Sequence, residues 1–293
     1  MPGRAREAGG IVIVPPVKNA MSDDFDLNAY LRRIGYHPTP AVDEQTLRGL
    51  AVAHVAALPF ENLNPWLGMP VLLSVDALQR KLVQGGRGGY CFEQNGLFAA
   101  ALRAIGFEVQ TLIARVLWNR PEDAITAQTH MLLQITLDGE SWLTDVGFGA
   151  LALAGALRLQ PDIEQPTALE PFRLLQHGDE WVMQGCVRGA WLPLYRFDLR
   201  PHPPIDYEVA NHYVSTHPQS NFVNLLIVDR TASDRRLSLC DREFTVRRLG
   251  AEPERRTLHS VAELRHVLES EFLLRLPDRD ALDRRLEALP EGD

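Results

Sequence analysis

The sequence predicts a multidomain α+β protein with a helical region first, antiparallel strands second and a mixed region last. Apolar residues recur at helical spacing over residues 22–106. Short β-type runs separated by Asp-Gly, Gly and Pro signals follow over 107–204, and residues 205–293 mix both patterns. A length of 293 residues suits two or three domains. We therefore expect three domains with these bounds, after an extension or disordered tail at 1–21.

Composition excludes several classes of protein. With 45% hydrophobic and 23% charged residues, the chain has the balance of a soluble globular protein and not of a disordered one. The net charge of −8 disfavours general binding to nucleic acid. Three cysteines make no disulfide framework, which favours a cytoplasmic protein with reduced thiols. No apolar run approaches the ~20 residues that cross a membrane.

The helical region divides at its own start and stop signals. We expect a first helix that ends at Gly35 and a second that stops before Pro59. A third ends at the glycines that begin at Gly85, and a fourth starts near Cys91 and runs to Gly106. The expected helices are 26–34, 43–57, 74–85 and 91–106.

The second region reads as an antiparallel barrel or sandwich. Its expected strands are 107–118, 129–137, 141–146, 172–175, 180–183 and 191–198. Pro201, Pro203 and Pro204 predict a connector. The last region is expected to hold strands at 221–229, 236–239 and 243–249, a helix at 260–269 and a charged C-terminal helix.

The segment GGRGGYCFEQN is the strongest candidate for chemistry. Four glycines in five positions allow a tight turn, and Cys91 follows where a helix is predicted to begin. The positive end of a helix dipole favours a thiolate there. A buried structural cysteine is the alternative. A phosphate-binding loop is excluded, because no Lys-Ser/Thr follows the glycines and no strand with a GxGxxG pattern is present.

A nucleophilic cysteine needs a base and an orienting group, and one predicted hairpin supplies both. A two-residue Asp-Gly turn at 138–139 pairs Leu137 with Glu140. Counting back places His130 and Asp145 on one face, one diagonal step apart. We expect that face to be the less apolar one, and a polar face that only meets solvent is the alternative. The opposite face carries the residues of an expected core: Met131, Leu133, Ile135, Trp142 and Val146.

With these residues in place, the chain resembles the arylamine N-acetyltransferases. The resemblance rests on RGGYCFEQN at 87–95, LPFENL at 58–63, the histidine of THMLL, DVGFG at 145–149, and the order of the three regions. It covers about residues 22–280. It implies a helical bundle, an antiparallel β-barrel and an α/β lid. The long insertion of vertebrate members between barrel and lid is absent, as in bacterial members.

The resemblance also implies a reaction. The acetyl group of acetyl-CoA would pass to the nitrogen of an arylamine, arylhydrazine or similar small aromatic amine, by a ping-pong route through acetyl-Cys91. His130 would act as the base and Asp145 would orient it, in a Cys-His-Asp triad of cysteine-protease-like type. The expected partners are this amine and the donor, with no nucleic acid, membrane or metal. The physiological acceptor and the oligomeric state stay open.

Two other functions are alternatives. A Cys-His-Asp hydrolase, an amidase or a transglutaminase-like enzyme, would use the same three residue types. A non-catalytic protein that binds CoA or arylamines would keep the fold alone, which the intact set of Cys91, His130 and Asp145 disfavours.

Further positions match family positions with assigned roles. The expected acceptor pocket, for which ordinary core packing is the alternative, is formed by Phe60, Val116 and Phe148. The expected CoA contacts are Thr126, Gly149, Tyr213 and Gln219. Arg87 and Glu61 are expected to form a structural ion pair that holds the glycine turn. Cys186 and Cys240 read as structural thiols, and three histidines match no common zinc spacing: His202, His212 and His217.

Overall fold

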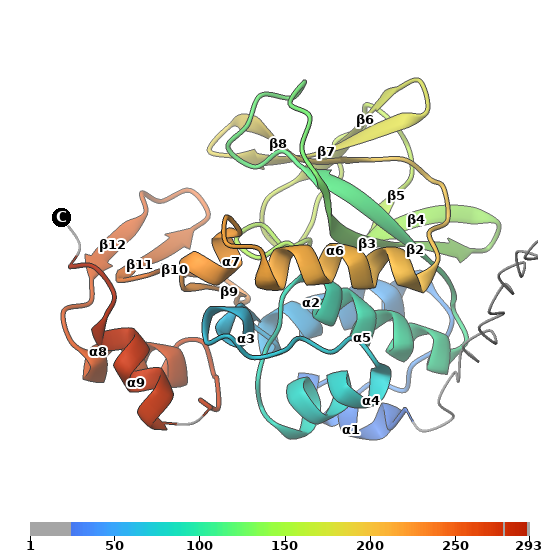
Figure 1. Cartoon of the computed structure of the whole chain (residues 1–293). Coiled ribbons are helices and arrows are strands. Elements are labelled where there is room, and N and C mark those ends of the chain that lie inside the picture. The colour runs from blue at the N-terminus through green and yellow to red at the C-terminus, as the bar shows by residue number, and fades with distance from the viewer. Residues whose placement is uncertain (1–24, 278, 292–293) are drawn as a thin grey trace, which may run out of the picture.

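The structure, a computed structural model, describes residues 25–277 and 279–291. The tail expected at 1–21 lies outside these residues. A group of helices lies below a strongly curved sheet, and a second sheet with two helices flanks both (Figure 1). Among the residues described, no helix is long and apolar enough to cross a membrane.

The helices of the first region form where their caps predict. Asp26 accepts a hydrogen bond from the Ala29 amide (2.8 Å), and Asp43 accepts one from the Thr46 amide (2.7 Å), so each satisfies a free N–H at a helix start. Gly35 ends the first helix with a positive φ. The elements are α1 (Leu27–Ile34), α2 (Glu44–Ala57), α3 (Leu63–Trp66), α4 (Val75–Leu78), the π-helical turn η1 (Gln79–Gln84) and α5 (Cys91–Ile105).

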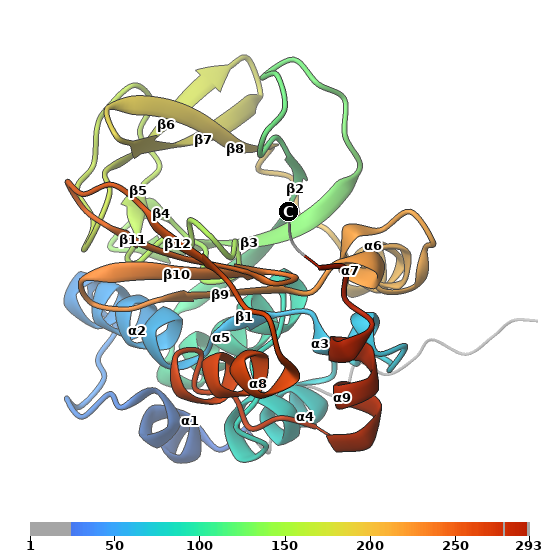
Figure 2. The same ribbon diagram turned by 90° about the vertical axis from the view of Figure 1, so that its left-hand side faces the viewer.

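The second region is a barrel and not a sandwich. Its seven antiparallel strands follow the order β5-β4-β3-β2-β8-β7-β6. Isolated bridges from Pro161 to Leu174 and from Gln165 to Phe172 bring the two edges nearly together, as the ring of strands in Figure 2 shows. The strands are β2 (Glu108–Val116), β3 (Gln128–Leu137), β4 (Glu140–Thr144), β5 (Leu157–Arg158), β6 (Phe172–His177), β7 (Glu180–Val187) and β8 (Ala190–Phe197).

The last region forms a second antiparallel sheet, in the order β1-β9-β10-β11-β12. Its edge strand β1 (Phe60–Glu61) comes from the helical region and pairs with β9. The other strands are β9 (Ile227–Thr231), β10 (Arg235–Cys240), β11 (Glu243–Arg248) and β12 (Glu254–Thr257), and the helices are α6 (Pro204–Thr216), α7 (Asn221–Asn224), α8 (Val261–Ser270) and α9 (Arg279–Glu287).

Two predictions in this region are wrong. The proline-rich segment expected to be a connector starts helix α6, with Pro204 as its first residue, where a missing N–H costs nothing. The strand expected over 221–229 is divided. Ser220 accepts a hydrogen bond from the Phe222 amide (3.2 Å) and caps the short helix α7, and extended backbone resumes only at Ile227.

Three apolar cores hold the elements together. One joins helices α1, α2 and α5 to one face of the β3–β4 hairpin, where Leu133 and Trp142 lie. A second fills the barrel interior and includes Leu132 and Leu143. A third packs α8 and α9 against the five-stranded sheet. Because β1 and the first core cross the expected domain bounds, the three-domain division stays a prediction.

Candidate active site

Cys91 begins helix α5 and lies directly after the glycine turn. It is 3% exposed. The turn needs glycine because neighbouring groups occupy the space of a side chain: a Cβ on Gly88 would lie 2.0 Å from the Pro59 carbonyl oxygen. A Cβ on Gly89 would lie 2.7 Å from Glu93 Oε2. The glycines therefore let the turn pack closely against the segment before β1, which fixes where the thiol lies.

The β3–β4 hairpin has the register that its turn predicts. Asp138 and Gly139 both have positive φ angles (52° and 77°), and Leu137 pairs with Glu140. This register brings His130 and Asp145 together, with 2.7 Å between His130 Nε2 and Asp145 Oδ2. The two residues are 3% and 1% exposed.

The expectation that the His–Asp face is the less apolar side of the sheet is wrong. That face is the barrel interior, where Leu112, Leu132 and Leu143 are fully buried. Both faces of β3 are therefore buried. An ion pair in such surroundings is screened far less than one in water.

Asn95 links the helix to the hairpin, and the sequence reasoning missed it. It lies one turn after Cys91 on α5, and its amide nitrogen donates to Asp145 Oδ1 (2.9 Å) and to the Met131 carbonyl (2.7 Å). Its amide oxygen accepts from the Val146 N–H (3.1 Å). One side chain thus ties the Cys91 helix to both strands. The spacing of four residues from the cysteine is the signal that could have identified it.

The charges at this site are coupled. Burial alone would lower the pKa of His130, but the Asp145 carboxylate and hydrogen bonds to Asp145 and Cys91 raise it to about 10. Burial would raise the pKa of Asp145, but His130, Asn95 and the Gly147 amide hold it below its ordinary value. Since Asp145 occupies Nε2, the other ring nitrogen, Nδ1, is left for the Cys91 thiol. The thiol also lies 3.6 Å from the Thr129 carbonyl oxygen.

Comparisons with known proteins identify the family. A family model described as N-acetyltransferase matches residues 43–281. The chain is 44% identical over 272 residues to an arylamine N-acetyltransferase of Mycolicibacterium smegmatis, covering 90% of this chain and 98% of that protein. It is 40% identical over 253 residues to the Escherichia coli K12 enzyme, covering 86% of this chain and 90% of that one. The chain belongs to the arylamine N-acetyltransferase family.

Solved structures agree with this result. The structure of the Mycobacterium marinum arylamine N-acetyltransferase in complex with CoA is 40% identical, with a TM-score of 0.87, and the match covers 90% of this chain and 99% of that one. These neighbours confirm the α+β fold class with its antiparallel barrel. As a family member, the chain is an acetyl-CoA-dependent acyltransferase.

Two of the residues expected in the acceptor pocket of this acetyltransferase lie close to the His–Asp pair. Phe148 stands edge-on to His130, with 5.2 Å between ring centroids. Val116 pairs with Tyr195, whose ring lies 4.8 Å from that of His130. Tyr195 was missed by the sequence reasoning, because it comes from β8, far along the chain. Phe60 lies on β1 and belongs to the neighbouring sheet.

The four residues expected to contact CoA lie on different elements. Thr126, in the loop after β2, donates to the Val116 carbonyl (2.9 Å). Gly149 turns the chain after Phe148 with a φ of 74°. On α6, Tyr213 is 45% exposed and stacks on His217 (4.6 Å). The Gln219 amide lies 3.2 Å from His217 Nδ1, in the turn after α6. Their role in CoA binding stays a prediction.

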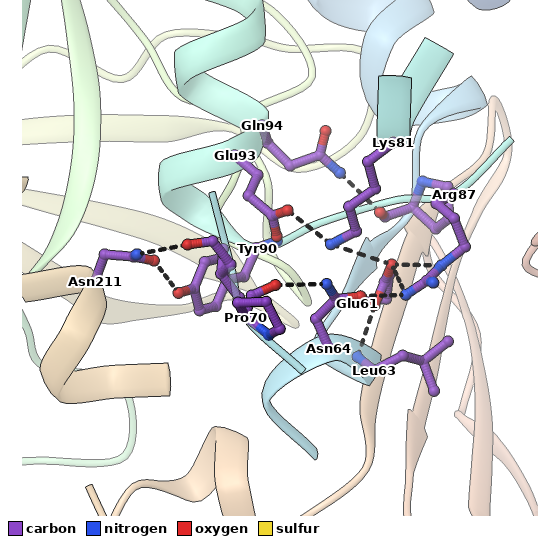
Figure 3. Close-up of polar contacts among 12 residues, drawn as sticks. Glu61, Leu63, Asn64, Pro70, Lys81, Arg87, Tyr90, Glu93, Gln94 and Asn211 are labelled. Atoms are coloured by element: carbon purple, nitrogen blue, oxygen red, sulfur yellow. Dashed lines mark hydrogen bonds and ion pairs between the residues drawn. The ribbon is translucent and has the colours of Figure 1, made fainter. Parts of the chain in front are cut away.

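Arg87 and Glu61 meet, as expected, and belong to a larger cluster (Figure 3). Arg87 Nε and Nη2 both donate to Glu61 Oε1 (3.0 and 2.8 Å), while Glu61 Oε2 accepts from the Leu63 amide (2.6 Å). Lys81 lies 2.7 Å from Glu93 Oε1 and 3.7 Å from Glu61 Oε1. Glu61 was expected at the end of the second helix. It lies on β1 instead, where pairing with β9 fixes its backbone.

No group of three or more residues with metal-binding side chains is present in the part of the chain that the structure describes. His202 pairs with Asp206 (3.2 Å), and His217 stacks on Tyr213. The histidines of this region therefore have local partners. Cys186 is half-buried and Cys240 exposed, and both are free thiols.

Proposed function

We propose that the enzyme transfers the acetyl group of acetyl-CoA to the nitrogen of small aromatic amines, arylamines or arylhydrazines, by a ping-pong reaction at Cys91. His130 acts as acid and base, and Asp145 orients and stabilises it. The observation that carries the proposal is the buried His130–Asp145 pair (2.7 Å) whose second ring nitrogen remains for the thiol at the start of α5. The relatives carry the name arylamine N-acetyltransferase.

In the first half-reaction, the Cys91 thiolate attacks the acetyl carbonyl of acetyl-CoA. The bond between that carbon and the CoA sulfur breaks, and the leaving thiolate takes a proton from the His130 imidazolium. One thioester replaces another, so the step is nearly thermoneutral. Cys91 contributes to the raised pKa of His130. Acylation removes this contribution, which makes the imidazolium a better acid when CoA leaves.

In the second half-reaction, the amine nitrogen attacks the acetyl-Cys91 carbonyl. Neutral His130 accepts the proton that the nitrogen loses, and the carbon–sulfur bond breaks to give the amide and the Cys91 thiolate. The thioester is converted to a more stable amide, so this step is downhill. Asp145 holds the imidazole in the correct tautomer and stabilises its positive charge in both steps.

The residues around this pair suit the two substrates. The rings of Phe148 and Tyr195 line the His130 side, and flat apolar walls suit an aryl ring. We assign Phe60, Val116 and Phe148 to the acceptor pocket. We assign Thr126, Gly149, Tyr213 and Gln219 to CoA. Support for a CoA site comes from the M. marinum relative, which was solved in complex with CoA.

The test is to incubate the protein with acetyl-CoA alone and to map the acetyl group by peptide mass. We expect one acetyl group, on Cys91, and its transfer to an added aniline or hydrazine. Cys91→Ala should form no adduct, whereas Cys186→Ala and Cys240→Ala, the matched controls, should keep activity within a few-fold. A hydrolase would release acetate to water without transfer to the amine, and a non-catalytic protein would bind CoA with no adduct. Either result would overturn the proposal.

A further inference from the structure

One buried carboxylate beside the site has no role in this mechanism. Asp229, in the middle of β9, is 6% exposed. Burial raises its pKa to about 6, against the opposing effects of Ser238, Arg247 and Arg236. Among the described residues, no cation forms an ion pair with it. A buried charge without a paired cation is costly, so its presence needs an explanation.

The nearby arginines are engaged elsewhere. Arg236 lies 2.7 Å from Glu170 Oε2. Arg247 donates to the Ala150 carbonyl (2.9 Å). Both guanidinium groups are thus held by other partners, which leaves the Asp229 carboxylate open to a ligand.

The register of the five-stranded sheet fixes the direction of Asp229. Its partners on the two neighbouring strands are Phe60 and Ser238, and directly opposed residues share a face of the sheet. Val228, next to it in sequence, lies in the core under α8 and α9, so Asp229 is on the other face. That face meets the loop after β4: a Cβ on Gly149 would lie 2.9 Å from Asp229 Oδ2 and 3.4 Å from the Phe60 ring.

The same loop reaches the thiol. A Cβ on Gly147 would lie 2.8 Å from the Cys91 Cα. Phe148, between the two glycines, packs on His130. A loop of three residues therefore has Cys91 at one end and the Asp229 carboxylate at the other. Figure 2 shows the five-stranded sheet beneath the barrel, on the side where this loop lies.

We propose, building on the proposed function, that Asp229 determines acceptor specificity by favouring aromatic amines with a positive charge or a hydrogen-bond donor at the far end of the ring. An amine with a carboxylate at that end is disfavoured. Two charges a few ångströms apart interact strongly where water is largely excluded. A donor on the acceptor would also satisfy a buried oxygen that otherwise lacks a strong partner.

The test uses three acceptors of one shape: 4-aminobenzamidine, 4-aminobenzamide and 4-aminobenzoate, which are positive, neutral and negative. We compare kcat/KM for the wild-type protein, Asp229→Asn and Asp234→Asn. Asp234 is exposed and removes the same charge from the same sheet. In Asp229→Asn the ratio of kcat/KM for the amidine to that for the carboxylate should fall by about tenfold or more, or ~1.4 kcal/mol. Asp234→Asn should keep the wild-type ratio.

A second measurement needs no variant. In the wild-type protein, benzamidine should inhibit acetylation of 4-aminobenzamide at about tenfold lower concentration than benzoate. An unchanged ratio in Asp229→Asn, an equal loss for all three acceptors, or stronger inhibition by benzoate would overturn the assignment of Asp229. Failure of the wild-type protein to form acetyl-Cys91 would instead overturn the proposed function, so the two failures are distinguishable.

Discussion

Two buried charge clusters lie on either side of Cys91, and they differ in how far their hydrogen-bonding capacity is used. In the first, Asp145 is fully satisfied by His130, Asn95 and the Gly147 amide, whereas His130 keeps one ring nitrogen for the thiol. The pair therefore has one open position, and that position faces the predicted nucleophile.

The second cluster is closed. Two acids, Glu61 and Glu93, are matched by two bases, Arg87 and Lys81 (Figure 3). Backbone amides use the remaining carboxylate oxygens. The comparison teaches that similar buried ion pairs can serve opposite ends: an open position gives reactivity, and a closed set gives position. Loss of the first should mainly affect the reaction, and loss of the second should mainly affect folding.

Asp145→Asn should break the open pair with the largest effect. The amide can hold the wrong His130 tautomer, and the same exchange in a serine protease triad costs ~10⁴-fold in turnover. We expect a loss of similar order in kcat, with a folded protein. Iodoacetamide labelling of Cys91 should also require a higher pH than in the wild type. An unshifted labelling profile would mean that the helix terminus alone, without the His–Asp pair, activates the thiol.

Arg87→Ala and Glu61→Ala should break the closed cluster. Each leaves a buried charge without its main partner, which typically costs ~3–5 kcal/mol. The double variant should lose much less than the sum, because neither charge is then left behind. Denaturant unfolding of the three variants measures this. If Arg87→Ala unfolds normally but binds CoA poorly, then Arg87 contacts the cofactor and its structural role is wrong.

The sequence predicted what local rules decide. Side chains alternate along strands and an Asp-Gly turn sets the register, so the pairing of His130 with Asp145 followed by counting. Caps at Asp26 and Asp43 gave the helix starts in the same way. The fold class followed from these elements together.

Contacts between distant segments were beyond this reasoning. Asn95 meets Asp145 50 residues later in the chain, and Tyr195 reaches His130 from the last barrel strand. Lys81 joins the closed cluster from a π-helical turn that apolar spacing does not reveal. Asp229 is placed only by the pairing of β1 with β9. Each position depends on packing between elements and has no local pattern.

Alkaline pH should separate the two clusters. The pKa of His130 is raised from 6.5 to about 10 in the folded protein, so its stabilisation is complete below pH 6.5 and is lost as the pH rises through about 10. At one proton per unit, the loss approaches ~1.4 kcal/mol per pH unit, or ~2–3 kcal/mol between about pH 7 and pH 9. His130→Gln should lack this slope. Equal slopes for the variant and the wild type would contradict a charged His130.

Lys81→Met should have the smallest effect, because its main partner can neutralise itself. Burial raises the pKa of Glu93, whereas Arg87 and Lys81 hold the pKa of Glu61 below its ordinary value against the effect of burial. When Lys81 is lost, Glu93 takes up a proton, which limits the cost to ~1–2 kcal/mol, near that of an unsatisfied buried polar group.

The size of this loss should depend on pH in a definite direction. A carboxyl whose folded-state pKa is raised destabilises the protein as the pH rises through it, so Lys81→Met should be closest to the wild type in mild acid and furthest from it above neutral pH. The matched control is Arg80→Met, which removes an exposed pair with Asp76 on the same turn and should change the free energy of unfolding by less than ~0.5 kcal/mol. Thermal or denaturant unfolding of both variants at several pH values gives the comparison. A loss for Lys81→Met as large as that for Arg87→Ala, or one that grows in acid, would show that Glu93 stays charged and that the cluster is held as one rigid unit.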